Sequence, residues 1–415
     1  MGSRIDGSTY ADILSGPAPN ESGPPAVYVH LPFCQSRCLS CDHITTVTHD
    51  STEIDRYLDD LERELALVTG HIGQGQTLSQ LYIGGGTPNY LNDPQLLRLA
   101  DLLEQSFRID DATDTTIEIN PRRSSASQLQ LLRGLGFRSI KLEVRDLDPG
   151  VQKALGKSNS FAVLEDVFRN ARDVGFETIG MDLVYGLPTQ SLQSIRTTLA
   201  GIVELGPDRL NCYAYARQPE MFRHQHAIDS PSLPSLADRL IMFNSIVDAM
   251  EQAGYVWVGL DSFSRQDDAL VSAQQERRLA HNWMGYNAHG SNTLLGFGAS
   301  SISEVGGACV QNHRDINDWH SAIERDELPV RAGVQLSERG MQHRQAVNGL
   351  LTNMELEGAL EPGEGEESIK ALQTLHDQGY LQRSDGGISI TPEGRYLLHH
   401  VAGNSALDLN WSNGW

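Results

Sequence analysis

Six short apolar runs, each followed by a segment with helical periodicity, constrain the fold of this chain more than any other feature. Alternating strand and helix patterns are typical of a parallel sheet built from βα units. We therefore predict an α/β fold, a partial (β/α)6 barrel, with strands at residues 26–31, 80–83, 115–119, 139–144, 178–183 and 209–213. In parallel β/α barrels the chemistry lies at the C-terminal ends of the strands, where the loops converge.

Three cysteines follow the first of these runs, at the end of a predicted strand. They are Cys34, Cys38 and Cys41, within the segment VYVHLPFCQSRCLSCDH. Cysteine thiolates hold iron–sulfur clusters, and a four-iron cluster with only three protein thiolates keeps one iron free for another ligand. The spacing therefore predicts a 4Fe–4S cluster that can act on a small molecule.

Two alternatives exist for these cysteines. A structural zinc site needs four closed ligands, and Cys212, Cys309 or His43 could supply the fourth. A disulfide framework fits less well, because the chain has five cysteines, an odd and sparse number for its length. The N-terminus also lacks a basic segment followed by an apolar one. A reducing, cytoplasmic setting is therefore expected.

Composition limits the classes of partner. The chain has 415 residues, of which 39% are apolar, and this suffices for one large domain and a smaller one. No stretch approaches the ~20 apolar residues that a membrane-spanning helix needs. There are 54 acidic residues against 32 basic ones, which gives a formal charge of −22. This charge favours neither nucleic acid nor an anionic membrane as a partner.

Polar or glycine-rich residues occur at three predicted strand ends. Residues 84–87 read Gly-Gly-Gly-Thr, and backbone without Cβ atoms can approach a ligand closely. Glu118 and Asp182 are carboxylates on runs otherwise suited to burial, where a charge needs a partner. For each carboxylate alone, an internal salt bridge is the slightly better interpretation. The three features together favour a shared pocket.

The motifs taken together resemble those of a known family. CxxxCxxC after VYVHLPF is followed by YIGGGTPNYL, IEINPR and MDLVYGLP, then by the segment 261–303 and a small C-terminal domain. This arrangement resembles the radical SAM superfamily and, within it, the oxygen-independent coproporphyrinogen III oxidases. The resemblance covers roughly residues 26–400. A related heme-chaperone branch shares the N-terminal motifs, but segment 261–303 is more similar to the oxidases.

The resemblance implies roles for individual residues. Cys34, Cys38 and Cys41 would bind a 4Fe–4S cluster whose free iron chelates S-adenosylmethionine (SAM). That SAM would be contacted by Tyr28, Gly85 and Glu118, with Glu118 at the ribose hydroxyls, and by Ile302 near the adenine. Positions that hold a second SAM in the family match Gly86, Thr87, Asp182 and Ala216.

The resemblance also implies a reaction. An electron from the reduced cluster would enter the sulfonium, giving methionine and a 5′-deoxyadenosyl radical, which abstracts hydrogen from the β-carbon of a coproporphyrinogen III propionate. Carbon dioxide leaves, a vinyl group remains and an external acceptor takes the last electron. The implied partners are a tetrapyrrole and a reductant such as flavodoxin or ferredoxin, and we expect a monomer.

Five positions depart from the family pattern, which has Cys at His43, a bulky aromatic residue at Ser40, Gln at Arg145, Arg at Lys157 and His at Ser262. Because two of these residues help to bind the second SAM, that molecule is left open. The departures also leave open a divergent paralogue that acts on another substrate, as a SAM-dependent methyltransferase or a cyclopropane-forming enzyme. A heme-binding chaperone, with His43 as an axial ligand, is the remaining alternative.

The chain divides into four predicted parts. Residues 1–25 form a Gly/Pro/Ser-rich leader that is expected to be disordered, residues 26–330 the barrel with its extension, and residues 404–415 a tail with two tryptophans. Residues 331–403 read as a winged-helix-like α+β domain, with a hairpin that turns at Asp385-Gly386. The acidic chain lacks a basic stripe, so this domain is expected to pack over the barrel rather than to bind DNA.

Overall fold

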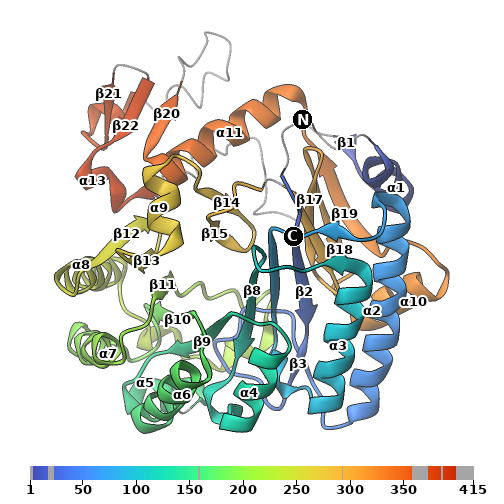
Figure 1. The fold of residues 1–415 in the computed structure, drawn as a ribbon. Helices are drawn as coiled ribbons and strands as arrows, with labels where there is room; N and C mark the ends of the chain where they lie inside the picture. The colour runs from blue at the N-terminus through green and yellow to red at the C-terminus, as the bar shows by residue number, and fades with distance from the viewer. Residues whose placement is uncertain are drawn as a thin grey trace.

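The computed structural model describes residues 3–16, 23–157, 159–291, 293–357, 373–384 and 387–398. Within these residues a curved 13-stranded sheet forms the centre of the molecule, in the order β1-β19-β18-β17-β16-β2-β6-β8-β9-β10-β11-β13-β12. Helices cover its outer, convex side (Figure 1). None of the helices in this described part combines the length and the apolar character needed to cross a membrane.

The six predicted parallel strands are confirmed, and they are consecutive neighbours in the sheet. They are β2 (Ala26–Leu31), β6 (Gln80–Gly85), β8 (Asp114–Ile119), β9 (Ser139–Arg145), β10 (Thr178–Tyr185) and β11 (Arg209–Ala214). The helices between and after them are α2 (Ser51–Ile72), α3 (Asp93–Ser106), α4 (Ala126–Gly134), α5 (Pro149–Leu155), α6 (Phe161–Val174), α7 (Leu192–Leu205) and α8 (Leu236–Gln252).

The sheet continues beyond the parallel strands on both sides. Next to β11 lie the antiparallel strands β13 (Ser262–Arg265) and β12 (Tyr255–Gly259). On the other side β16 (Leu294–Phe297) runs parallel to β2, and the antiparallel strands β17 (Ile302–Val305), β18 (Ala308–Asn312) and β19 (Val330–Gln335) follow it. The connections between these strands contain α9 (Ala269–Gln275), β14 (Ala280–Asn282), β15 (Gly285–Asn287) and α10 (Ile316–Glu324). Two short pairs of parallel strands lie outside the main sheet: β3 (Phe33–Cys34) with β4 (Thr46–Val47), and β5 (Gln76–Thr77) with β7 (Phe107–Arg108).

The six parallel strands carry different residues on their two faces. One face joins the helices in the main hydrophobic core, and Val29, Ile117 and Met181 on it are 0% exposed. Because successive side chains of a strand alternate between faces, the residues between them point to the inside of the barrel. There the side chains are polar: Tyr28, His30, Tyr82, Glu118, Lys141, Glu143, Asp182, Asn211 and Tyr213. The barrel interior is thus a polar chamber rather than the packed apolar centre of an ordinary β/α barrel.

The predicted disorder of the leader is wrong for much of its length. Residues 3–4 form β1 (Ser3–Arg4), which pairs with β19, and α1 (Gly7–Ser15) follows, capped by Asp6. Ile5, Tyr10 and Leu14 are 2%, 4% and 5% exposed. These apolar residues pack in the main core. The prediction of disorder rested on the average composition of the leader, which does not show where its few apolar residues lie. Residues 17–22 lie outside the described residues.

The small C-terminal unit begins later than predicted, because β19 continues the main sheet to Gln335. Its elements are α11 (Glu338–Asn353), β20 (Glu355–Glu357), β21 (Leu381–Ser384), β22 (Gly387–Ile390) and α13 (Pro392–Arg395). The two strands of the predicted hairpin pair as expected, and β20 completes a three-stranded sheet. The predicted turn at Asp385-Gly386 and the tail 404–415 lie outside the described residues.

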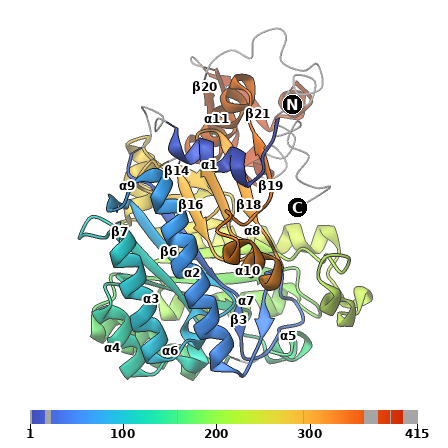
Figure 2. The same ribbon diagram turned by 90° about the vertical axis from the view of Figure 1, so that its right-hand side faces the viewer.

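This unit has a core of its own and packs against the extension of the barrel, above it in Figure 2. Arg344 of α11 forms an ion pair of 2.6 Å with Glu304 of β17. The Tyr286 hydroxyl donates to the Leu351 carbonyl over 2.9 Å, and the Arg395 guanidinium lies 4.4 Å from the centre of the Trp257 ring. These contacts agree with the packing role expected from the sequence.

A buried carboxylate ties α2 to the extension of the sheet. Glu64 is 1% exposed, and its oxygens accept hydrogen bonds from the Gly298 amide over 2.7 Å, the Asn312 side chain over 2.6 Å and the Trp319 indole over 3.2 Å. Burial outweighs these donors and raises the pKa of Glu64 to about 7. The carboxyl group therefore binds a proton in the folded protein at a pH where it is ionised in the unfolded chain.

We expect this group to make the protein less stable as the pH rises. Between its unfolded pKa of 4.5 and its folded pKa of about 7, the folded state binds more protons, so its contribution to the free energy of unfolding falls by up to about 3 kcal/mol. Urea unfolding of the apoprotein and of Glu64→Gln at pH 5 and pH 8 measures this. The stability advantage of the wild type over the variant should be smaller at pH 8. An equal difference at both pH values contradicts the prediction.

Candidate active site

Cys34 is the last residue of β3, and Cys38 and Cys41 lie in the loop between β3 and β4, at the C-terminal edge of the barrel. Together they are called the cysteine loop. Cys34 and Cys38 are partly exposed, Cys41 is 9% exposed, and all three are free thiols. Other segments hold the loop by hydrogen bonds: the Cys41 carbonyl accepts from His224 over 2.8 Å and from Gln225 over 3.0 Å. The sequence prediction that these cysteines form one group is consistent with this placement.

The electrostatic surroundings of the thiols differ. Burial raises the pKa of Cys34 to about 11 and also raises the pKa of Cys38. At Cys41 burial acts in the same direction, but hydrogen bonding to His43 and its charge outweigh it, so the pKa is lowered. Each of the three thiols is close enough to influence the ionisation of another. Thiolates are the soft donors that iron–sulfur clusters use.

The other two cysteines lie elsewhere. Cys212 is 0% exposed and belongs to the apolar face of β11, and Cys309 is 1% exposed within β18. Neither position allows its thiol to join the loop as the fourth ligand of a zinc site. His43, the remaining choice for that ligand, instead places its Nδ1 3.0 Å from the Asp42 carboxylate.

The glycine-rich end of β6 lies directly against the strand that leads to Cys34. The Gly86 amide donates to the Leu31 carbonyl over 2.8 Å, and the Thr87 amide donates to the Phe33 carbonyl over 2.9 Å. The Thr87 hydroxyl is 3.6 Å from the Cys34 sulfur. A Cβ atom on Gly86 would lie 2.6 Å from the Phe33 carbonyl oxygen. Glycine is therefore required here by close approach of two backbones.

Gly86→Ala is expected to destabilise the protein by about 1–3 kcal/mol, because the two backbones must separate to admit the methyl group. The same shift moves Thr87 away from Cys34 and should lower the iron content after reconstitution. Gly134→Ala is the matched control, since a Cβ atom at this α4 position meets nothing within 4 Å. The control should leave the iron content unchanged and raise the stability by up to about 1 kcal/mol. Equal stability and iron content in both variants would contradict this account.

Glu118 lies on β8 next to this glycine segment. Its carboxylate accepts from the Tyr82 hydroxyl over 2.7 Å and from the Gly85 amide over 3.2 Å. Burial raises the pKa of Glu118, opposed mainly by the charge of Lys141. The carboxylate is thus held by neutral donors and retains acceptor capacity toward the chamber. The structure brings Gly85 and Glu118 together as predicted.

Tyr28 and His30 project from β2 into the same chamber. His30 Nε2 lies 3.0 Å from the Ile44 carbonyl, which can only accept, so Nε2 carries the proton and Nδ1 is an acceptor. Burial lowers the pKa of His30 to about 4, so the ring is neutral. The Tyr28 hydroxyl, 3.0 Å from Nδ1, must therefore donate to His30. This leaves the oxygen of Tyr28 to accept a hydrogen bond from a ligand.

Asp182 lies on β10, and it has the internal salt bridge that its sequence position suggested. One carboxylate oxygen is 3.0 Å from Lys141 Nζ, and the other accepts from the Asn211 side chain over 3.0 Å. Ser262 extends this chain, because its hydroxyl donates to Asn211 over 2.8 Å. The ammonium group of Lys141 also lies 5.9 Å from the centre of the Tyr82 ring.

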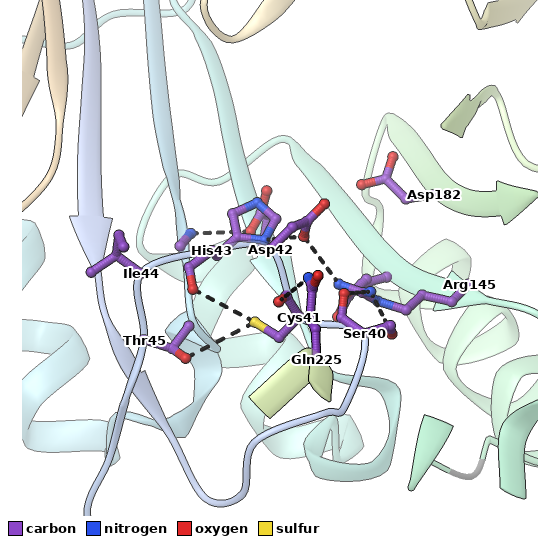
Figure 3. A network of polar contacts seen from close by, with 12 residues as sticks. Ser40, Cys41, Asp42, His43, Ile44, Thr45, Arg145, Asp182 and Gln225 are labelled. Carbon is purple, nitrogen blue, oxygen red and sulfur yellow. Dashed lines mark hydrogen bonds and ion pairs between the residues drawn. The ribbon is translucent and has the colours of Figure 1, made fainter. Parts of the chain in front are cut away.

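Arg145 and Lys157 lie beside the cysteine loop, as Figure 3 shows for Arg145. Both form ion pairs with Glu143, and Lys157 Nζ is 2.6 Å from that carboxylate. Arg145 also donates to the carbonyl of Ser40 over 2.9 Å and to its hydroxyl over 2.8 Å. The guanidinium thus occupies the side of the loop where Ser40 stands in place of a larger residue.

The last two predicted residues lie on opposite sides of the row of six parallel strands. Ala216 is exposed in the segment after β11, and Ile302 is the first residue of β17, beside β16. Their predicted roles remain predictions, like those of the other predicted site residues.

Sequence reasoning missed several polar residues of the chamber: Tyr82, Lys141, Glu143 and Asn211. A signal for them was present. In the strand segment KLEVR every second residue is charged, and the residues between are Leu142 and Val144, which are 0% and 2% exposed. This period of two marks a strand with one apolar and one polar face.

Comparison with known proteins shows the family. Residues 28–200 match the model of the Radical SAM superfamily. The chain is 35% identical over 390 residues to the oxygen-independent coproporphyrinogen III oxidase of Pseudomonas aeruginosa, covering 91% of this chain and 84% of the relative. Its identity to the Escherichia coli oxidase of the same name is 33% over 388 residues, with the same coverage.

A solved structure agrees with the sequence comparison. The coproporphyrinogen III oxidase from Escherichia coli, described as a radical SAM enzyme, superposes with a TM-score of 0.91 and 31% sequence identity, over 98% of this chain and 94% of that one. The family uses a 4Fe–4S cluster and SAM. The chain is therefore a radical SAM enzyme and belongs to the oxygen-independent coproporphyrinogen III oxidase family.

Proposed function

We propose that this protein carries out the oxygen-independent oxidative decarboxylation of coproporphyrinogen III propionates in porphyrin biosynthesis. The observation that carries the proposal is the similarity to oxidases of this name over 91% of the chain. The polar chamber supports it, because a carboxylate-rich tetrapyrrole requires a site lined by hydrogen-bonding groups.

The residues divide the task as follows. Cys34, Cys38 and Cys41 would hold the cluster, which would supply the electron for reductive cleavage of SAM. Glu118 would accept hydrogen bonds from the ribose hydroxyls, and the Gly85 backbone would allow close approach of the ligand. Tyr28, with its proton directed to His30, accepts from the ligand. The apolar packing behind these strands holds them in place.

The substrate side of the reaction balances in three steps. One hydrogen atom is removed from the β-carbon of a propionate, with one electron. The bond to the carboxylate then breaks and releases carbon dioxide. The second electron passes to an external acceptor, and a vinyl group remains.

An anaerobic assay of the reconstituted protein with SAM, dithionite and coproporphyrinogen III tests the proposal. Substrate-dependent formation of 5′-deoxyadenosine, carbon dioxide and a vinyl product is the expected result. Formation of 5′-deoxyadenosine without decarboxylation would overturn the choice of substrate and favour a paralogue, for example a methyltransferase, which methylated products would reveal. Stoichiometric heme binding without SAM cleavage would favour the chaperone alternative.

We further propose that the protein acts as a monomer in the reducing cytoplasm, and that an acidic flavodoxin or ferredoxin reduces its cluster. Five exposed cationic residues, here called the basic surface, lie on the cysteine loop or on segments that contact it: Arg37, Arg122, Arg123, Lys153 and Arg223. Arg123 donates to Gln35 over 3.2 Å, and Arg223 precedes His224, which contacts Cys41. In a chain with a formal charge of −22, this concentration of positive charge suits a small acidic protein.

Reversing the charge of the basic surface is expected to weaken the binding of the protein reductant. The double variant Arg37→Glu/Arg123→Glu should raise the flavodoxin concentration needed for half-maximal rate by about 10-fold, because charge complementarity controls the encounter rate. Its rate with dithionite should stay unchanged. Arg108→Glu is the control, since that side chain is 71% exposed and lies near the N-terminal ends of the strands. A control that responds like the double variant would contradict a specific docking surface.

A further inference from the structure

We propose that this chain binds a single SAM molecule, because internal ion pairs occupy the polar positions that the family resemblance assigns to a second one. The pairs are those of Glu143 with Arg145 and Lys157, and of Lys141 with Asp182. The residues present therefore do not fit a second SAM, and the chain departs here from the expectation set by its relatives.

Arg145 has almost no capacity left for a ligand. A guanidinium has five N–H donors. In this structure its Nε is paired with Glu143, and its Nη1 donates to both the carbonyl and the hydroxyl of Ser40. Its Nη2 lies 3.5 Å from Asp42, and the side chain is 5% exposed. Arg145 thus binds the cysteine loop from one side and cannot grip an external carboxylate at the same time.

Glu143 stands where such a carboxylate would lie, between the two cations. One of its oxygens pairs with Arg145, and the other accepts from Lys157 over 2.6 Å. Lys157 also donates to the Glu143 backbone carbonyl over 3.3 Å, and its side chain is 12% exposed. Although burial acts in the opposite direction, Arg145 and Lys157 hold the pKa of Glu143 well below its usual range. The internal carboxylate is therefore ionised and satisfies both cations.

Asp182 is paired internally with a cation. Its two carboxylate oxygens lie 3.0 Å from Lys141 Nζ and from the Asn211 side-chain nitrogen that donates to it. The side chains of Asp182 and Lys141 are 14% and 15% exposed. The carboxylate keeps acceptor capacity, but Lys141 already neutralises its charge, so Asp182 attracts a cationic ligand group only weakly.

The local backbone explains why the ion pairs of Lys141 and of Glu143 lie close together. Lys141 and Glu143 are alternate residues of β9, so both point into the chamber. A β-bulge against β10 follows at residue 144, and Arg145 has a φ of +65°. The cations of these pairs are 5–15% exposed, whereas the Glu143 side chain is 40% exposed. A ligand that breaks the pairs leaves the largely buried cations without partners, and this cost opposes its binding. Gly86 and Thr87, the backbone positions of the second site, are present, but they do not supply the missing charges.

Binding stoichiometry tests this inference without any tetrapyrrole, so its outcome is independent of the proposed substrate. Anaerobic equilibrium dialysis of the reconstituted protein with radiolabelled SAM should give one SAM per 4Fe–4S cluster. Two SAM molecules per cluster in the wild type would overturn the proposal. The cluster's EPR signal reports separately on the SAM bound to iron.

Variants then test the cause. Glu143→Ala, alone and with Lys141→Ala, removes the internal partners, and the stoichiometry should rise from one toward two. Glu143→Gln serves if the alanine variant loses its cluster. Glu177→Ala is the matched control, because it removes the carboxylate of another ion pair, 2.8 Å from Arg138 and half-exposed; its stoichiometry should stay at one. A stoichiometry of one in every Glu143 variant with an intact cluster would overturn the assignment to these ion pairs.

Discussion

Cys38→Ser is expected to lower the formation of 5′-deoxyadenosine by more than about 10²-fold. Even substitutions of residues that only hydrogen-bond to a metal ligand lower metal affinity or activity by up to about 10²-fold, and Cys38 is predicted to be a ligand itself. A serine hydroxyl does not replace a soft thiolate toward iron. The three thiols belong to one loop held by His224 and Gln225, so the loss of one leaves the other two in place without a complete ligand set.

Iron and sulfide content, the EPR spectrum after reduction and 5′-deoxyadenosine are measured together. Cys309→Ser is the matched control, because that cysteine is 1% exposed within β18 and lies apart from the loop. The control should keep its cluster and its SAM cleavage. A Cys38→Ser protein with a full cluster, or a Cys309→Ser protein without one, would contradict the assignment of the ligands.

Glu118→Ala is expected to raise the Kd for SAM by about 10²-fold, because a hydrogen bond to a charged group contributes about 1.5–3 kcal/mol. The loss has two parts. The ribose hydroxyls lose their acceptor, and the Tyr82 hydroxyl and Gly85 amide lose the carboxylate that holds them at 2.7 and 3.2 Å. Glu118→Gln retains one oxygen acceptor and should show a smaller effect.

Equilibrium dialysis on cluster-containing protein measures this Kd. Glu177→Gln removes a carboxylate charge from the half-exposed pair with Arg138 and is the control for charge alone. Its Kd should equal that of the wild type. An unchanged Kd in Glu118→Ala with an intact cluster would remove Glu118 from the SAM site.

Local patterns were sufficient to predict the strands of the barrel. The alternation of apolar runs and helical segments predicted all six parallel strands, with ends that differ from the observed ones by at most two residues. The cysteine spacing and the glycine-rich segment belong to continuous stretches of chain, so the sequence shows them directly. The leader shows the limit of composition, since Ile5, Tyr10 and Leu14 become ordered only by packing on segments far away in sequence.

The partners of the charged chamber residues could not be predicted in this way. The sequence shows Lys141, Glu143, Arg145 and Lys157 close together, but their partners depend on which strands are neighbours and on the β-bulge after β9. Arg145 in particular reaches Ser40, a residue 105 positions away. The identity of a cationic residue in the sequence does not show whether its side chain is paired in the fold.

The sequence by itself determined the α/β barrel through its hydrophobic periodicity, and its motifs identified the family by resemblance; the three cysteines remain the predicted cluster ligands. Only the tertiary structure decided which polar groups are free to meet a ligand. The chamber residues come from six strands, and whether a charge faces a ligand or an internal partner depends on distances of a few ångströms between strands that the chain order does not specify.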